Sequence, residues 1–240
     1  MDAVNENTPV PGSSGATCVT MFTSPLATLN SLRDRPQWFM ALLVAGAYSV
    51  LVNFYVVQRA GLERLMTKLL KSAPLIDPQG VLQSALLHQN RIVLIQALAT
   101  FVGAFVIAFV VARVLWLLLI VAGKDVVFKR VFAVVAHATL LTTVIRESAL
   151  ALTVTLVRDL DKLDLRNPLA TNPGFFVHPA SPTASRILTW LDLITLTNIF
   201  LLVVGLTKVC DGLSRRVAAA LVVVPWLAWV GASLLLASLA

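Results

Sequence analysis

The segment IVLIQALATFVGAFVIAFVVA, residues 92–112, decides the fold class of this protein. It carries no charged side chain. A helix needs about 20 predominantly apolar residues to cross the hydrocarbon core of a bilayer, and this segment has that length. Ala104, Ala108 and Ala112 recur every fourth residue, which lets a second helix approach closely. The segment is therefore predicted to be a transmembrane helix within a bundle.

The composition of the whole chain also indicates a membrane protein. Of 240 residues, 58% are apolar and 13% are charged, and the mean hydropathy is +0.86. A soluble domain averages roughly 45–50% apolar and about 25% charged residues, so lipid must be the solvent for much of this chain. The net charge of +7 is typical of loops near anionic headgroups. Since no basic cluster is interleaved with base-stacking aromatics, nucleic acid is not an expected partner.

Four further apolar segments have a similar length, which predicts an all-α, polytopic transmembrane helix bundle with five spans. Residues 1–20 are rich in Pro, Gly, Ser and Thr and are predicted to be a disordered tail. Residues 21–240 are predicted to form one transmembrane domain. Its spans are expected at about 38–57, 92–112, 131–157, 187–209 and 217–239.

Amphipathic helices are predicted before span 1 and between spans 1 and 2. The first begins at Ser24-Pro25, where the missing N–H of proline is harmless. Its apolar face is formed by Leu26, Leu29 and Leu32. A solvated turn is the alternative for this stretch. Two more helices with one apolar face are expected within residues 58–90, the second starting at Asp77-Pro78. All three are too short or too polar to span and are predicted to be interfacial.

The distribution of basic residues favours a cytoplasmic N-terminus. The raw count of Lys and Arg on the two sides of the membrane does not decide the orientation. With the N-terminus in the cytoplasm, however, the inner loops are short and strongly basic. The outer loops are long and mix basic with acidic residues, and charges in short loops are the more informative ones. The inner segments then hold Arg33, Arg35, Lys124, Lys129, Arg130, Lys208, Arg215 and Arg216.

Several stretches follow one another in an order that is typical of one family. They are Ser24-Pro25 to Pro36-Gln37-Trp38, Pro78-Gln79 with Gln83 and Gln89, Gly123 with Phe128-Lys129-Arg130-Val131-Phe132, Leu191-Asp192-Leu193-Ile194-Thr195, Leu202-Val203-Val204-Gly205-Leu206 and Gly212-Leu213-Ser214. In this order they resemble the Yip1-domain family of multispan membrane proteins, in its bacterial branch, over roughly residues 21–239. The resemblance implies the fold and a place in the bacterial inner membrane, but no specific activity.

Two features depart from the family pattern. Thr197 stands near a place where the family often has a tryptophan, and the short acidic-aromatic motif of eukaryotic members is not visible before span 1. The association of those eukaryotic members with Rab GTPases is therefore not carried over to this chain.

The sequence shows no sign of catalytic machinery. The zinc motif HExxH, the nucleophile elbow GxSxG, the aspartyl motif GxGD and a Walker loop are all absent. His88, His137 and His178 fall in an interfacial helix, a span and a loop. The two cysteines, Cys18 and Cys210, are far apart and form no CxxC motif. We therefore expect no enzyme activity, no cofactor and no metal site.

Four polar residues inside the predicted spans form a candidate site: Asn53, Arg146, Glu147 and Asp192. Ionisable groups near mid-bilayer cost about 2.5–3.5 kcal/mol each, so they face the bundle and find partners. A rise of about 1.5 Å per residue places Arg146 and Asp192 at one depth in the outer leaflet, with Asn53 in the same layer. The hypothesis is a polar cluster. It either fixes helix register, as a structural ion pair, or binds a transported solute or ligand; separate snorkelling to water is a further alternative.

Two functions remain open at this level. The first is an integral membrane scaffold or interaction protein of the Yip1 type, acting in membrane organisation or trafficking-like processes. The second is a small transporter or channel that uses the polar cluster. Five spans and the absence of copied segments argue against a duplicated transporter. The expected partners are the lipid bilayer and, beyond it, membrane proteins or a second copy of the chain.

Overall fold

The computed structural model describes residues 14–70, 77–160, 163–164, 167–176 and 182–239. Every regular element within these ranges is an α-helix, in agreement with the predicted fold class. The helices are α1 (Ser14–Thr23), α2 (Pro25–Ser31), α3 (Phe39–Ala60), α4 (Leu62–Leu70), α5 (Pro78–Leu87), α6 (Gln89–Val121), α7 (Phe128–Leu156), α8 (Pro173–Phe176), α9 (Pro182–Trp190), α10 (Leu193–Val209) and α11 (Arg215–Leu239).

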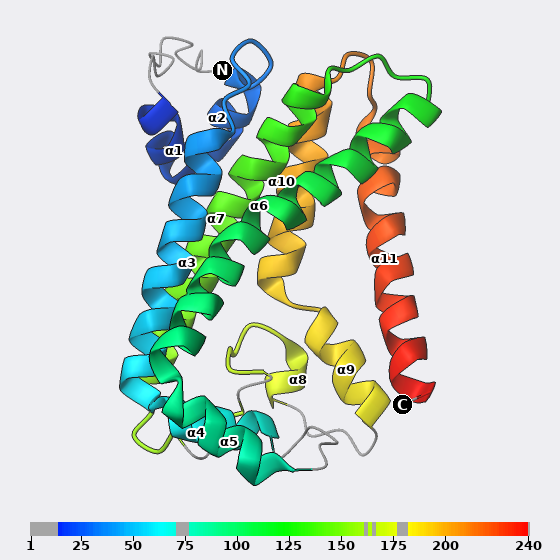
Figure 1. The fold of residues 1–240 in the computed structure, drawn as a ribbon. Coiled ribbons are helices and arrows are strands. Elements are labelled where there is room, and N and C mark those ends of the chain that lie inside the picture. The colour runs from blue at the N-terminus through cyan, green and yellow to red at the C-terminus, as the bar shows by residue number, and fades with distance from the viewer. Residues whose placement is uncertain (1–13, 71–76, 161–162, 165–166, 177–181, 240) are drawn as a thin grey trace.

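Helix α7 forms the centre of the bundle. Helices α3, α6 and α10 pack against it, and α11 packs against α10 at the periphery (Figure 1). Residues 131–136 of α7 are at most 7% exposed. In the described part of the chain, α3, α6, α7 and α11 are long and apolar enough to cross a membrane, and α10 is a shorter apolar helix of 17 residues. The predicted transmembrane helix bundle is confirmed, and the short apolar helix α10 lies within the fourth of the five predicted spans.

Helix α6 extends well beyond the predicted span 92–112. It has 33 residues, which corresponds to about 50 Å and exceeds the roughly 30 Å hydrocarbon core. It must therefore tilt or project from the core, and Figure 1 shows it inclined relative to α3. Its last turns are fixed by Trp116, whose Nε1 donates to Val126 O at 2.9 Å. Arg113 lies 4.8 Å from the centre of the Trp116 ring. The predicted span ended early because it stopped at this arginine.

The fourth predicted span, 187–209, is not one continuous helix. Helix α9 ends at Trp190, and Asp192 forms the N-cap of α10 in an extended conformation. Aspartate competes with the helical backbone for hydrogen bonds and favours cap positions, which explains the place of the break. The preceding loop supplies a backbone partner, since Leu193 N donates to Thr171 O at 2.9 Å. The prediction of one uninterrupted span is wrong at this break.

The N-terminal region is more ordered than predicted. Residues 14–20 belong to α1, so the predicted tail 1–20 is wrong for them, while residues 1–13 lie outside the described residues. Cys18 and Met21 are at most 6% exposed, and α1 packs against α2, α3 and α7. Tertiary packing stabilises most short helices. Two well-placed apolar side chains therefore order a segment whose average composition is polar.

The predicted amphipathic helices are confirmed as helices. Helix α2 starts at Pro25, and its Leu29 is fully buried whereas Leu26 is 51% exposed. A solvated turn does not bury a leucine, so that alternative is excluded. Helices α4 and α5 connect α3 to α6, and Asp77 caps α5 through its side chain. These three segments are thus helical, as their cap residues and apolar faces predicted, and their interfacial location stays a prediction.

Candidate functional site

The seam between α3 and α7 brings two of the four predicted site residues together. Glu147 of α7 accepts a hydrogen bond from Ser49 Oγ of α3 at 3.5 Å. One turn further along α3, Asn53 Nδ2 donates to Ser49 O at 2.8 Å. Ser49 was not among the predicted site residues, although it follows Ala41 and Ala45 at the four-residue spacing of a helix-contact face. Asn53, Ser49 and Glu147 form one connected polar group.

Two hydroxyl pairs accompany this group on the same seam. Tyr48 Oη and Ser148 Oγ lie 2.7 Å apart, and Tyr55 Oη and Thr155 Oγ1 are also 2.7 Å apart. Each pair joins α3 to α7. Hydrogen bonds between helices in a membrane contribute about 0.6 kcal/mol each on average. The polar side chains of this seam therefore hold the two helices in register.

Arg146 does not join this group, and its predicted pairing with Asp192 is not formed. Arg146 is exposed on α7, whereas Asp192 is half-buried at the start of α10. Among the described residues, neither of the two makes an ion pair. Neighbouring residues of a helix point about 100° apart, so Glu147 faces α3 while Arg146 faces elsewhere. The predicted cluster is corrected to a group with Asn53 and Glu147, to which neither Arg146 nor Asp192 is bonded.

Asp192 organises the break between α9 and α10. Its Oδ2 accepts hydrogen bonds from Thr195 N at 3.1 Å and from Thr195 Oγ1 at 3.2 Å. Its Oδ1 is buried and has no hydrogen-bond partner among the described residues. The adjoining loop is fixed by two amide hydrogen bonds between Asn167 and Asn172, of 2.7 and 3.2 Å. Asp192 thus serves as a helix cap, a role that its predicted depth in the bilayer did not suggest.

His137 is a packed core residue of α7. It is 1% exposed, and its Nδ1 lies 2.9 Å from Ala133 O of the same helix. A carbonyl oxygen only accepts, so Nδ1 is the protonated nitrogen in this contact. The described residues contain no group of three or more His, Cys, Asp or Glu side chains that could hold a metal ion. The expectation that the protein has no metal or cofactor stays a prediction.

Three pockets are lined by described residues, and Asn53, Ser49 and Glu147 line none of them. One is a groove of about 480 Å³ between α2, α10 and the start of α11. Another lies beside α4 and α5, and a third holds only about 10 Å³ between α3, α4 and α7. None of these three is lined by a residue of the predicted cluster. The groove beside α2 carries Lys208 and Arg215, which the sequence interpretation had used only to orient the chain.

Comparison with known proteins places this fold in a family. The Yip1 domain family matches residues 19–237, which includes all five apolar helices. A search of curated proteins and a search of solved structures each gave no match. The match agrees with the order of sequence features described above and with the observed helix bundle. The chain belongs to the Yip1 domain family of integral membrane proteins.

Proposed function

We propose that this protein is a scaffold or interaction protein that organises lipid or protein partners in the membrane and catalyses no reaction. The use of its intramembrane polar residues carries the proposal. Ser49 of α3 donates to Glu147 of α7, Asn53 donates to the Ser49 carbonyl within α3, and Asp192 caps α10. Polar residues of a transport path line a water-filled cavity, whereas these side chains hold helices in place.

Close helix packing supports the same proposal. A Cβ atom at Gly205 of α10 would overlap the side chain of Val134 and lie 3.2 Å from Leu29 Cδ2. A Cβ atom at Gly46 of α3 would lie 3.0 Å from Phe101 Cδ2 of α6. Side chains of neighbouring helices therefore pack directly against the helix backbone at both glycines. This favours a fixed bundle over a transporter that must alternate between two packings.

The outer faces of α6 and α11 offer surface for partners. Only 22% of the apolar window of α6 and 11% of that of α11 are buried within the chain. In a bilayer these faces contact lipid. A partner helix replaces lipid through van der Waals packing, because lipid tails are as apolar as the side chains that they cover. We propose that membrane proteins or a second copy of the chain bind here.

We also propose a bacterial inner membrane location with a cytoplasmic N-terminus. The starts of α3, α7 and α11 and the ends of α6 and α10 lie at one end of the bundle (Figure 1). The short basic loops therefore share one side, which the positive-inside rule assigns to the cytoplasm. A reporter enzyme that is active only outside the cytoplasm is expected to be active when fused after Ala240. Activity of the same reporter inserted in the α6–α7 loop would reverse the orientation.

Photocrosslinking in native membranes tests the scaffold function. A photoreactive residue at Leu98, which is 55% exposed on α6, is expected to give a reproducible adduct with a membrane protein or a second copy of the chain. The matched control is the same probe at Leu140, which is fully buried in α7 and should give no intermolecular adduct. Solute flux in liposomes that Glu147→Gln abolishes would contradict the proposal and favour transport.

A further inference from the structure

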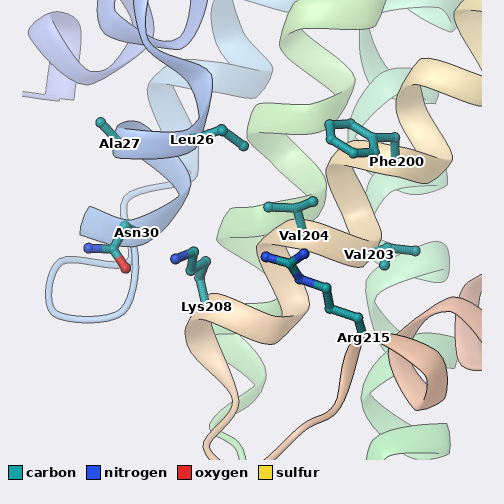
Figure 2. A pocket seen from close by; sticks show the side chains of 8 residues that line it. All are labelled: Leu26, Ala27, Asn30, Phe200, Val203, Val204, Lys208 and Arg215. Atoms are coloured by element: carbon teal, nitrogen blue, oxygen red, sulfur yellow. The ribbon is translucent and has the colours of Figure 1, made fainter. Parts of the chain in front are cut away.

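The groove beside α2 combines apolar walls with two positive charges (Figure 2). Its volume of about 480 Å³ falls within the range of small-molecule sites. The residues that matter for its chemistry are Leu26 and Asn30 of α2, Phe200, Val204 and Lys208 of α10, and Arg215 of α11. Its lining contains no carboxylate. The groove is therefore suited to a ligand with one anionic and one apolar part.

The apolar walls of the groove come from two different helices. Leu26 of α2 is 51% exposed and Phe200 of α10 is 58% exposed, while Val204 is half-buried beside them. Phe200 lies in the middle of α10, and Lys208 lies in its last turn. The walls therefore run from the apolar part of the span toward its charged end. A phospholipid in the bilayer also runs from an apolar acyl chain in the hydrocarbon core to a charged headgroup at the membrane surface.

The two cations line the groove from consecutive helices, α10 and α11. Figure 2 shows the Arg215 guanidinium reaching back from the start of α11 toward Val204, and the Lys208 side chain turned toward Asn30. Both cations are exposed, and neither makes a hydrogen bond or ion pair with the described residues. Their charges are therefore available to an anion held between α2 and α10.

The acidic residue of the connecting loop is already engaged. Asp211 lies between α10 and α11 in the sequence, and its Oδ1 is 2.7 Å from Arg33 Nη2. The next residue, Gly212, accepts a hydrogen bond from Lys124 Nζ at 2.7 Å. These contacts fix the loop and direct its carboxylate to another arginine. Lys208 and Arg215 are thus left without a neutralising partner in the described part of the chain.

We propose that the groove binds one anionic phospholipid from the leaflet that faces the N-terminal side of the bundle. The lipid phosphate lies between Lys208 and Arg215, and a guanidinium suits phosphate because it donates two parallel hydrogen bonds. The Asn30 amide donates to a further headgroup oxygen. One acyl chain follows Leu26 and Phe200 toward the bilayer centre. This inference does not rest on the scaffold function, since a transporter could hold the same lipid.

Binding of defined lipids to the full-length protein tests the proposal. Phosphatidylglycerol and phosphatidylcholine with identical acyl chains are titrated into the protein in detergent, and bound lipid is counted by native mass spectrometry. The wild-type protein is expected to hold one phosphatidylglycerol molecule more tightly than any phosphatidylcholine. Each basic residue near a membrane surface contributes about fivefold to anionic-lipid affinity. The double variant Lys208→Ala/Arg215→Ala should therefore weaken binding about 25-fold.

Matched variants separate the groove from general surface charge. Lys129→Ala/Arg216→Ala removes two exposed charges from the same end of the bundle but leaves the groove intact, and it should bind phosphatidylglycerol nearly as the wild type does. Ala27→Trp keeps all charges and fills the groove, so it should weaken binding. Equal losses in the two double variants, or unchanged affinity in Ala27→Trp, would overturn the proposal. So would competition by free glycerophosphate at the lipid's own concentration, because the site would then recognise phosphate without the chain. Circular dichroism checks that each variant is folded.

Discussion

Replacing Gly205 with alanine tests the close contact of α10 with α7 and α2. The new Cβ atom would overlap the side chain of Val134 and lie 3.2 Å from Leu29 Cδ2. Both neighbours are fully buried, so neither can swing into lipid to make room. Overpacking of a well-packed core costs about 1–3 kcal/mol. Against this, alanine is favoured over glycine by roughly 1 kcal/mol in a helix interior.

A matched control isolates the packing contribution. Gly103 lies within α6, and a Cβ atom there meets nothing within 4 Å. Gly103→Ala therefore has the helix-propensity gain without the clash, and it should be neutral or slightly stabilising. Because the propensity gain is common to both variants, their difference in unfolding free energy reports the clash alone. That difference is expected to be about 1–3 kcal/mol.

Unfolding by sodium dodecyl sulfate in mixed micelles, followed by circular dichroism, measures the two stabilities. Gly205→Ala should unfold at a lower mole fraction of the detergent than the wild type. Adding Val134→Ala should recover part of the loss, since it removes the methyl groups that the new Cβ atom overlaps. If Gly205→Ala is as stable as Gly103→Ala, the close packing of α10 on α7 and α2 is refuted.

Three further predictions concern caps, thiols and a surface ion pair. Asp192→Ala should lower the free energy of unfolding by about 1 kcal/mol in the same assay, because it removes the N-cap of α10. Asp192→Asn should lower it much less, and equal losses would contradict the capping role. Burial raises the pKa of the Cys18 and Cys210 thiols, so maleimide labelling of the folded protein should be slow at pH 7. Labelling should become faster as the pH rises toward about 9.5, because the reactive thiolate then forms. Rapid labelling at pH 7 would argue against burial of the two thiols. Arg33→Ala should change stability by less than about 1 kcal/mol, and less still in high salt, because Arg33 and Asp211 are 46% and 72% exposed in their ion pair.

The spans could be predicted because the length of an apolar segment reports directly on the thickness of the bilayer. The starts of α2 and α5 followed from Pro25 and Asp77, since helix caps are read from local sequence. That residues 14–20 fold into α1 could not be predicted in this way. It depends on burial of Cys18 and Met21 against helices that come later in the chain.

Residue counting along the spans predicts the depth of the candidate site residues, but it does not predict which way their side chains face. Counting residues placed Asn53 in the layer of Arg146, the neighbour of Glu147, and the structure connects Asn53 to Glu147 through Ser49. The same count placed Arg146 and Asp192 at one level, yet which side of a helix meets a neighbour depends on tertiary packing. Asp192 was misplaced for a second reason. Asp192 lies at a break between two helices, where Leu193 N donates to Thr171 O of the preceding loop. Hydropathy contains no information about such a loop contact.

The position of α2 links the packing of the bundle to the proposed lipid site. One face of α2 buries Leu29 close to Gly205, while its other face presents Leu26 and Asn30 to the groove. A ligand that binds only the folded arrangement stabilises it, and the stabilisation grows with the logarithm of the free ligand concentration once that exceeds Kd. Coupling between two sites is reciprocal, so docking of α2 on α10 strengthens lipid binding by the same factor by which the lipid strengthens that docking. An anionic lipid in the groove would therefore act on the same contact between α2 and α10 that Gly205 allows.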